Sequence, residues 1–379
     1  MTSAHVAVIA GTRPEAIKLA PVIHALRGAG LRTRVVASGQ HRELLHEAFQ
    51  AFGLSADVDL AVMRDNQDLP GLTARLIDGV AGELSRERPR FVLVQGDTTT
   101  TLAGSLCAFY ADLPCGHVEA GLRSGDRRAP WPEEMNRILA DSLCTRYYPP
   151  TEAAAGNLRA QGIDASAIVV TGQTGVDAAL LMAERLSGSI PGELRGLPGL
   201  GALRLVYATG HRRESFDGGL AGVAAALRAL VEERDDLLVV YPAHPNPNVA
   251  RELASVAGSH PRLHIIPAVS YAASIWLMSR AAVVVSDSGG IQEEAPSFGV
   301  PVVVTRDVTE RPEGIAAGFL RIVGTRTDRV LQEVTSVLDD AGLRSRLEAV
   351  PNPYGDGRAS QRIAADVAAV LAGRRNDGA

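Results

Sequence analysis

The feature that most constrains the fold is an alternation of short apolar runs with helical stretches along nearly the whole chain. Such runs are typical of buried parallel strands, and the helical stretches between them supply the crossover connections that parallel strands need. In the first half, the expected strands are 5–11, 33–38, 91–96, 115–119, 145–149 and 168–172. The expected helices include 98–111, 133–144 and 151–161. The alternation therefore predicts an α/β fold.

The same alternation restarts in the second half, after a Gly- and Pro-rich stretch at 186–203 that reads as a surface connection. The strands expected there are 204–209, 237–242, 263–267, 282–287, 301–305 and 320–323. A chain of 379 residues also exceeds what one hydrophobic core usually serves. We therefore expect two Rossmann-like domains, 1–172 and 173–357, with a cleft between them. By composition alone, the amphipathic stretch 358–373 fits either domain.

Charge and cysteine usage exclude several classes of protein. The net charge of −5 and the pI near 6.0 argue against a general nucleic-acid binder, which needs a basic surface. The three cysteines, Cys107, Cys115 and Cys144, lack the spacing of a metal site, and their apolar surroundings predict buried free thiols in a reducing compartment. We find no secretory leader and no apolar run long enough for a membrane span, so a soluble, cytoplasmic protein is expected.

One basic residue near the N-terminus is unusual, because Lys18 is the single lysine among 38 basic side chains. It follows a buried strand, and Thr12 with Glu15 forms a capping-box pattern that opens a helix. Arg13 and Lys18 therefore flank a helix N-terminus, where free N–H groups and the helix dipole favour an anion. We interpret this stretch as a phosphate or carboxylate site. Chance survival of one lysine is the alternative explanation.

A second candidate anion site is SDSGGIQEEAPSFG at 286–299. The chain has neither the P-loop pattern nor a G-x-G-x-x-G after its first strand, so a P-loop NTPase and an ordinary NAD enzyme are disfavoured. Here Ser288, Gly289 and Gly290 end an apolar strand and open a helix, which lets backbone N–H groups approach a diphosphate. Glu294 lies one turn further and could accept both hydroxyls of a ribose. An ordinary strand–Gly–helix turn with a serine cap is the alternative.

Three carboxylates form the candidate catalytic group. Asp97 and Glu119 each end an apolar run, and Glu133 follows a proline at a helix start. Carboxylates after adjacent parallel strands meet at the edge where open α/β sheets bind ligands. Mutual repulsion and burial then separate their proton affinities, which gives one group to hold a proton and another to take one. Each alone could be a solvated loop residue. His211 follows an expected strand of the second half and could equally be a core or loop histidine.

These residues lie in motifs that resemble the non-hydrolysing UDP-N-acetylglucosamine 2-epimerase family over essentially the whole chain. The motifs are GTRPEAIKLAPV, GQHREL, QGDTTTTLA, HVEAGLRSGD, PWPEEMNR, GHRRESF, YPAHPNPNV, SDSGGIQEEAPSFG and DVTERPEG. The resemblance implies a fold similar to glycosyltransferase-B enzymes, with UDP held mainly by the C-terminal domain. It also implies a homodimer, and a final helix, 358–373, that packs back on the first domain.

The resemblance also implies site residues and a reaction. UDP would be held by Arg13, His211, Ser288, Gly289, Gly290 and Glu294. The sugar would be surrounded by Lys18, Asp97, Glu119 and Glu133. The family eliminates UDP across C1–C2 of UDP-N-acetylglucosamine to give 2-acetamidoglucal, then adds UDP back with the C2 proton on the opposite face. This chemistry needs a base, an acid, and cations or N–H donors for the leaving diphosphate. It requires no metal and no nicotinamide. The residues leave open which carboxylate makes which proton transfer.

The chain departs from the family pattern at two places. TGQTGVDAAL at 171–180 replaces the usual TGNTVIDAL, which puts Gln173 and Gly175 where the interdomain hinge is expected and predicts altered closure. In regulated bacterial members, a second substrate molecule contacts the segments matching Gln40, Arg212 and His244. The glutamine and arginine expected beside them appear here as Glu43 and Asn66, which weakens the case for such regulation.

Three other functions remain open. A hydrolysing epimerase would release free N-acetylmannosamine and UDP. A glycosyltransferase of the same fold would share the Ser-Gly-Gly…Glu nucleotide site without needing three carboxylates in the first half. A non-catalytic UDP-sugar sensor would be favoured by the loss of Asp97, Glu119, Glu133 or His211, and all four are present.

Overall fold

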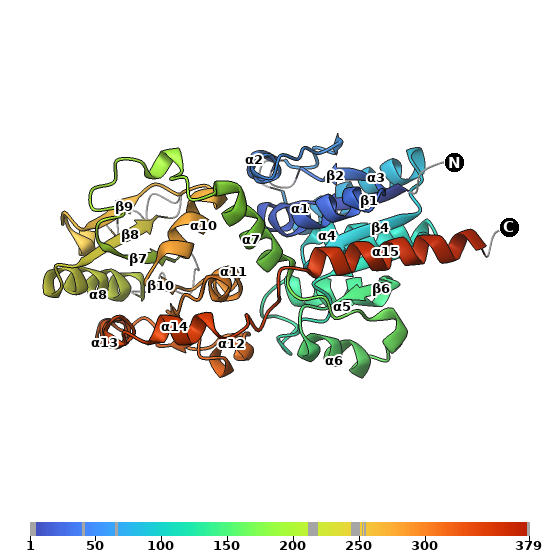
Figure 1. Cartoon of the computed structure of the whole chain (residues 1–379). Helices are drawn as coiled ribbons and strands as arrows, with labels where there is room; N and C mark the ends of the chain where they lie inside the picture. The colour runs from blue at the N-terminus through green and yellow to red at the C-terminus, as the bar shows by residue number, and fades with distance from the viewer. Residues whose placement is uncertain are drawn as a thin grey trace. The chain divides into compact units, whose positions relative to one another are not determined.

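The computed structural model describes residues 5–39, 42–64, 67–210, 219–243, 251, 253 and 255–376. By its internal contacts the chain divides into two compact units. Unit 1 contains residues 1–178 and 355–379, and unit 2 contains residues 179–354. Each unit is described here by itself (Figure 1).

Unit 1 is built on a parallel sheet with the strand order β3-β2-β1-β4-β5-β6. Its strands are β1 (His5–Ala10), β2 (Arg32–Ala37), β3 (Val58–Asp59), β4 (Phe91–Gln95), β5 (Cys115–Val118) and β6 (Arg146–Tyr148). The central strands are continuous apolar runs in the sequence, because helices cover both faces of a parallel sheet. Val6, Val8, Val92 and Leu93 are accordingly fully buried.

The helices of unit 1 alternate with its strands. They are α1 (Arg13–Gly28), α2 (Arg42–Ala51), α3 (Leu69–Arg86), α4 (Thr99–Tyr110), α5 (Glu133–Leu143), α6 (Glu152–Ala160), the start of α7 (Thr174–Leu186) and α15 (Ala359–Asn376). The C-terminal helix α15 packs against α1 (Figure 1). It is also anchored by Asp366, whose carboxylate accepts hydrogen bonds from Arg146 and from the Tyr148 hydroxyl. The last helix is thus part of the same core as the first.

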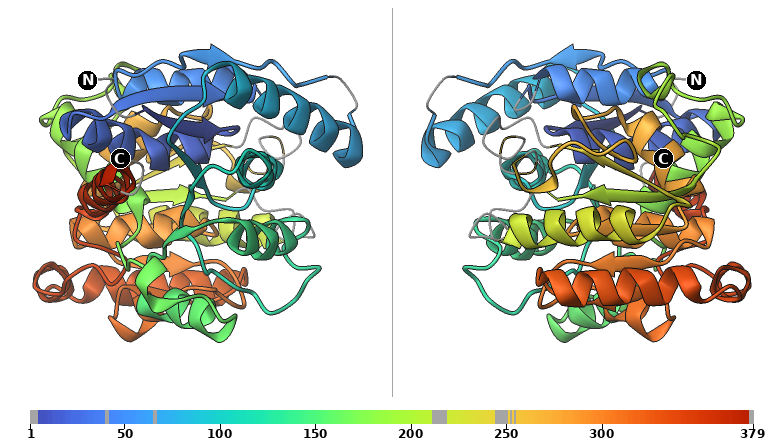
Figure 2. Two further views of the ribbon diagram at one scale, coloured as in Figure 1. Left: turned by 90° about the vertical axis from the view of Figure 1, so that its right-hand side faces the viewer. Right: turned by 90° about the vertical axis from the view of Figure 1, so that its left-hand side faces the viewer.

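Unit 2 repeats the architecture with the strand order β12-β11-β10-β7-β8-β9, again all parallel. Its strands are β7 (Arg204–Thr209), β8 (Leu237–Pro242), β9 (Leu263–Ile266), β10 (Val283–Ser286), β11 (Val302–Val304) and β12 (Leu320–Ile322). Its helices include α8 (Gly219–Glu233), α10 (Tyr271–Arg280), α11 (Gly289–Glu294), α12 (Pro312–Ala316), α13 (Thr327–Asp339) and α14 (Leu343–Glu348). Helices α8 and α13 pack side by side (Figure 2).

This architecture confirms the α/β class and the two Rossmann-like sheets. It also confirms that the three cysteines are buried and free. No helix within the described residues is long and apolar enough to cross a membrane.

One expected strand is wrong. Residues 168–172 form a single parallel bridge, between Tyr147 and Ile168, rather than a strand. The segment continues along β6 through hydrogen bonds from Val169 N to the Tyr147 carbonyl and from Thr171 N to the Pro149 carbonyl. It lies at the sheet edge with Val170 exposed, and Gly172 then turns at a φ of +92° into α7. The apolar character of 168–172 therefore predicted a strand where the chain only runs along the edge strand β6. Conversely, the two-residue strand β3 was too short for its pattern to be seen.

Candidate functional site

The candidate site of unit 1 lies at the carboxyl ends of β1, β4 and β5, which are consecutive neighbours in the sheet. Gly11 and Thr12 follow β1, Gly96 and Asp97 follow β4, and Glu119 follows β5 directly. From β1 the chain builds the sheet outward in one direction through β2 and β3, and from β4 it builds outward in the other direction through β5 and β6. The strand order therefore reverses between β1 and β4. Ligands bind at this kind of switch point in open α/β sheets. The carboxylates expected at adjacent strand ends are therefore brought to one edge.

Glu15 connects the two helices that begin at this edge. Its carboxylate accepts hydrogen bonds from Gly11 N (2.9 Å) and Thr12 N (2.6 Å), which confirms the capping box expected at the start of α1. It also accepts from the Thr98 hydroxyl (2.8 Å), and Thr98 is the N-cap of α4. Burial raises the pKa of Glu15 although these hydrogen bonds oppose the shift. The two helix N-termini are thus fixed through one buried acid.

Lys18 is held by this helix against the carboxylate of Glu119. Its Nζ lies 2.6 Å from Oε1 and 2.8 Å from Oε2 of Glu119. The side chains are 18% and 7% exposed, so the pair is shielded from most of the solvent. A partly buried ion pair of this kind is screened less by salt than a surface pair. The unique lysine therefore lies beside a candidate catalytic carboxylate.

The carboxylate of Glu119 also accepts two side-chain amides. Gln95, the last residue of β4, donates to Oε2, and Gln173 donates to Oε1 at 2.7 Å. The backbone of Glu119 adopts a φ of +69°, a left-handed conformation that non-glycine residues seldom take. Residues in such conformations cluster at functional sites. Glu119 thus has a left-handed backbone conformation and a carboxylate that accepts hydrogen bonds from three side chains.

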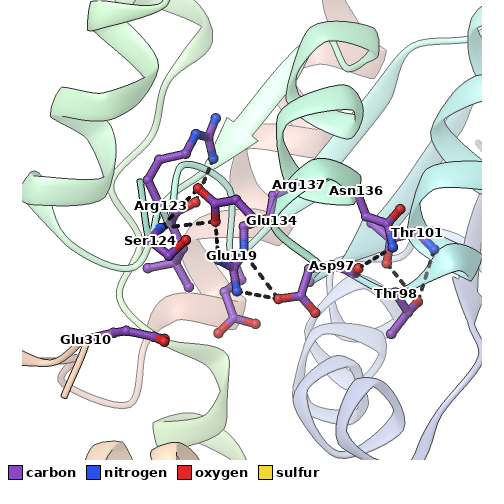
Figure 3. A network of polar contacts seen from close by, with 12 residues as sticks. Asp97, Thr98, Thr101, Glu119, Arg123, Ser124, Glu134, Asn136, Arg137 and Glu310 are labelled. Atoms are coloured by element: carbon purple, nitrogen blue, oxygen red, sulfur yellow. Dashed lines mark hydrogen bonds and ion pairs between the residues drawn. The ribbon is translucent and has the colours of Figure 1, made fainter. Parts of the chain in front are cut away.

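Asp97 belongs to a second network, which runs through α5. Arg137 donates from Nε (3.1 Å) and Nη2 (2.6 Å) to the same oxygen, Oδ2 of Asp97 (Figure 3). The Asn136 amide holds the Asp97 carbonyl at 2.9 Å. Among the described residues, Oδ1 of Asp97 has no hydrogen-bond partner, and the side chain is 30% exposed. Asp97 therefore keeps one oxygen available while Arg137 fixes its orientation.

Glu133 and Glu134 are adjacent in sequence but differ in environment. Glu134 is buried and accepts from Arg137 Nη1 (2.7 Å) and from the backbone N of Ser124 and Gly125 (Figure 3). Glu133 is half-buried and makes no hydrogen bond with any described residue. Glu134 is therefore structural, whereas Glu133, the residue expected from sequence, is free to meet a ligand.

A buried histidine, His117, connects the ends of β4 and β5 to α5. His117 on β5 contacts Asp141 Oδ1 through Nδ1 and the Gly96 carbonyl through Nε2, both at 2.7 Å. Because both partners are acceptors, both ring nitrogens are placed to donate, which favours the imidazolium. Burial lowers the pKa of His117, but the charge and hydrogen bond of Asp141 outweigh it and leave the pKa raised. Burial opposes the ionised form of Asp141, yet His117 and Arg123 lower its pKa.

Arg13 is the first residue of α1 and is half-buried. It has no hydrogen-bond or ion-pair partner within the described part of the chain. A guanidinium at a helix N-terminus is suited to an anionic ligand, because the N–H groups and the dipole there act in the same direction.

In unit 2 the Ser-Gly-Gly turn follows β10 and opens α11. Ser288 is the N-cap, but its hydroxyl makes no capping hydrogen bond. At Gly289, an added Cβ would lie 2.6 Å from the guanidinium carbon of Arg311, which is itself held by Glu293 at 2.8 Å. At Gly290, an added Cβ would meet nothing nearer than the Ser288 Oγ at 3.9 Å. A side chain at the first glycine would therefore displace the Arg311 guanidinium, whereas the second glycine leaves its backbone accessible.

The remaining candidates divide between described and undescribed residues. Glu294 ends α11 and accepts a hydrogen bond from the Tyr271 hydroxyl at 3.1 Å. Glu43 is exposed in the first turn of α2. His211, Arg212, Gln40, His244 and Asn66 lie outside the described residues.

The unit 1 arrangement is suited to proton transfer next to a developing anion. Two carboxylates, Asp97 and Glu119, lie at neighbouring strand ends with a compact ammonium beside one of them. Such groups can take and give a proton while cations stabilise negative charge. Sequence reasoning missed Gln95 and Arg137 as partners of the carboxylates. Both lie inside motifs already singled out, QGDTTTTLA and PWPEEMNR, but nothing in a motif says which side chain faces inward.

Comparison with known proteins gives a consistent result. The family model described as UDP-N-acetylglucosamine 2-epimerase matches residues 24–368. A probable UDP-N-acetylglucosamine 2-epimerase of Ralstonia solanacearum is 43% identical, over 97% of this chain and 99% of the relative. The UDP-N-acetylglucosamine 2-epimerase of Escherichia coli strain K12 is also 43% identical, over 94% of this chain and 96% of the relative.

Solved structures agree with the sequence relatives. The UDP-GlcNAc 2-epimerase from Neisseria meningitidis, bound to UDP-GlcNAc, superposes with a TM-score of 0.88 at 38% identity, covering 96% of this chain and 100% of that chain. The glycotransferase of kitacinnamycin, at 14% identity and a TM-score of 0.61, shares the fold alone. On the family match and the full-length relatives, this chain belongs to the UDP-N-acetylglucosamine 2-epimerase family of enzymes.

Proposed function

We propose that this enzyme interconverts UDP-N-acetylglucosamine and UDP-N-acetylmannosamine by eliminating UDP and adding it back. The observation that carries the proposal is the Lys18–Glu119 pair, at one strand end, next to Asp97 at the neighbouring strand end. Relatives over almost the full length are named UDP-N-acetylglucosamine 2-epimerases, and a similar structure was solved with UDP-GlcNAc bound.

The reaction balances without a redox step and without water. A base removes the proton from C2, the electron pair of that bond forms the C1=C2 double bond, and the C1–O bond to UDP breaks. The products are neutral 2-acetamidoglucal and UDP. Re-addition of UDP at C1, with a proton delivered to the opposite face of C2, gives the epimer. The two faces require two proton carriers, which supports the use of more than one carboxylate.

Roles follow from the environment of each group. Glu119, Asp97 and Glu133 are the candidate proton carriers. Asp97 has a free carboxylate oxygen and Glu133 is unpaired among the described residues. Lys18 supplies a compact positive charge at the sugar. An ammonium differs from a guanidinium in shape and in its ability to give up a proton.

UDP requires cations and N–H donors. The proposed ligands are Arg13, His211, Ser288, Gly289, Gly290 and Glu294. In support, Arg13 is unpaired within the described residues, and the Ser288 hydroxyl is not used to cap α11. Hydrogen bonds of this kind would strengthen as charge develops on the leaving diphosphate.

One incubation tests the proposal: UDP-N-acetylglucosamine with enzyme in D2O, followed by proton NMR and mass spectrometry. Each product molecule should carry deuterium at C2, and a second UDP-sugar should appear at equilibrium. Slow release of 2-acetamidoglucal and UDP is also expected, because the neutral intermediate can leave.

Other outcomes separate the alternatives. Free N-acetylmannosamine as the main product would identify a hydrolysing enzyme. Transfer of the sugar to an added acceptor, with C2 hydrogen retained, would identify a glycosyltransferase. Binding without turnover would leave a UDP-sugar sensor.

We also propose a homodimer, which is the assembly that the family resemblance implies. Sedimentation equilibrium of the purified chain should give twice the mass of 39.9 kDa. A single species at 39.9 kDa would contradict the proposal.

A further inference from the structure

Gln173 lies at the N-terminal boundary of α7, and its amide reaches the carboxylate of Glu119. Its Nε2 donates to Oε1 of Glu119 at 2.7 Å, and the residue is 2% exposed. The two residues are 54 positions apart in sequence. A buried amide next to a candidate catalytic carboxylate needs an explanation beyond the filling of space.

The contact complements those already made to the same carboxylate. Oε1 receives Gln173 and Lys18, and Oε2 receives Gln95 and Lys18. The ammonium is a point charge on a flexible stem, and its three donors rotate freely. The two amides instead approach the two oxygens separately, so they fix the plane of the carboxylate as well as its place.

The backbone that carries Gln173 is itself held firmly. A Cβ added at Gly355 would lie 3.3 Å from Gln173 N, so the chain entering α15 packs directly on this segment. Asp177, one turn further along α7, accepts from the backbone N of Ala359 (3.2 Å) and Ser360 (2.7 Å). Arg362 donates to the Thr171 carbonyl at 2.8 Å. The start of α15 and residues 171–177 thus form a fixed support within unit 1.

We propose that Gln173 is a positioning residue that orients the Glu119 carboxylate for reaction with the sugar. The inference rests on the proposed epimerisation and names a residue that acts through Glu119 and does not touch substrate. It also reinterprets residue 173, which the sequence suggested as part of a hinge. The Gln173 side chain donates a hydrogen bond to the Glu119 carboxylate, and the Gln173 backbone packs against the segment before α15.

Two substitutions distinguish the role of the Gln173 amide donor from that of the side-chain volume. Gln173→Met keeps the length and apolar stem but removes the amide, while Gln173→Asn keeps the amide on a stem one methylene shorter. The matched control is the neighbouring Thr174→Val. Thr174 is 1% exposed, and its hydroxyl has no hydrogen-bond partner in the described part of the chain, so the isosteric change removes nothing that is used.

The experiment measures kcat and KM for UDP-N-acetylglucosamine, the Kd for UDP and the Tm. For Gln173→Met we expect kcat to fall about 30-fold, because small misplacements of a reacting group cost up to about 100-fold. KM and the UDP Kd should stay within twofold. Gln173→Asn should give a kcat between those of wild type and Gln173→Met, and Thr174→Val should stay within twofold in every quantity.

Several results would overturn the proposal. One is a kcat for Gln173→Met within twofold of wild type. Another is a rise in KM with kcat unchanged, which would indicate a substrate-binding role. A kcat for Gln173→Asn below that of Gln173→Met, or an equal loss in Thr174→Val, would mean that packing rather than the amide matters.

Two further measurements guard the interpretation. The Tm values of Gln173→Met, Glu119→Met and the double variant form a cycle, because Glu119→Met removes both acceptor oxygens. The sum of the two single losses in Tm should exceed the loss in the double variant, because the contact can be lost only once. Additive losses would overturn the contact itself. If wild type shows no deuterium at C2, the proposed function fails. Wild-type exchange with an unaffected Gln173→Met overturns the positioning role alone.

Discussion

The two units share one topology and use it for different chemistry. Numbered within its own unit, each sheet has the order 3-2-1-4-5-6, so β10 in unit 2 corresponds to β4 in unit 1. In both units, candidate active-site residues follow the first and fourth strands, on either side of the switch point. Unit 1 places carboxylates and an ammonium there, whereas unit 2 places a serine and two glycines after β10.

The difference shows that the fold fixes where a site lies but not what it does. In unit 1 the charges are held by long-range contacts such as Lys18–Glu119 and Arg137–Asp97. In unit 2 the turn leaves little space for a side chain at Gly289, where the Arg311 guanidinium lies against the backbone. We therefore expect substitutions at the Lys18–Glu119 pair of unit 1 to change kcat and substitutions in the unit 2 turn to change UDP binding.

The largest effect should come from Glu119→Gln, which keeps the size of the side chain and removes its charge. Proton transfer by a positioned group contributes about 10²- to 10⁴-fold, so kcat should fall about 10³-fold. The Kd for UDP, measured by calorimetry, should stay within threefold because Glu119 is not among the proposed UDP ligands. A large loss of UDP affinity with little change in kcat would break the comparison.

Lys18→Arg should lower kcat/KM at least tenfold, or about 1.4 kcal/mol of transition-state stabilisation. The ammonium lies within 2.8 Å of both carboxylate oxygens, and a planar guanidinium cannot occupy the same place without moving Glu119. Steady-state kinetics with a circular dichroism control for folding measure the effect. Activity within twofold of wild type would make the unique lysine incidental.

Gly289→Ala should raise the Kd and KM for the UDP-sugar about fivefold, which is about 1 kcal/mol, and spare kcat. The new Cβ would lie 2.6 Å from the Arg311 guanidinium, which must then leave its contact with Glu293. Gly290→Ala serves as the folding control, because its Cβ approaches nothing nearer than 3.9 Å and the Tm should hold. A fall in kcat with unchanged Kd would assign chemistry to unit 2.

The smallest effect concerns pH and the buried His117–Asp141 pair of unit 1. The folded pKa of His117 is raised, so its stabilising contribution is complete below the ordinary value of about 6.5 and is lost as the pH rises through the folded pKa. The pKa of Asp141 is lowered, so its contribution holds above about 3.9 and is lost as the pH falls further.

Histidine NMR and hydrogen exchange measure this dependence. The His117 ring should remain protonated above pH 6.5, and amide protection in β5 should decrease as the pH rises through the folded pKa. Titration of His117 below pH 6.5 would contradict the imidazolium and its two donated hydrogen bonds. Unit 2 provides the internal reference in the same sample.

Much of this protein could be predicted from its sequence because the relevant signals are local. Strand and helix periods repeat within a few residues, which is why β1, β4, β5, α4 and α5 were expected close to their observed bounds. The capping box of Thr12 and Glu15 spans three residues and was expected for the same reason. Family motifs added the candidate site residues, whose catalytic roles stay predictions.

Tertiary structure decided what lies against what. The Lys18–Glu119 contact joins residues 101 positions apart, and Gln173–Glu119 joins residues 54 apart. The burial of Glu134 beside the free Glu133 depends on the loop at Ser124 and on Arg137, and 168–172 covers the sheet edge instead of joining it. Periodicity reports which face of an element is apolar, but partners across the fold depend on how elements pack, and one sequence pattern allows several packings.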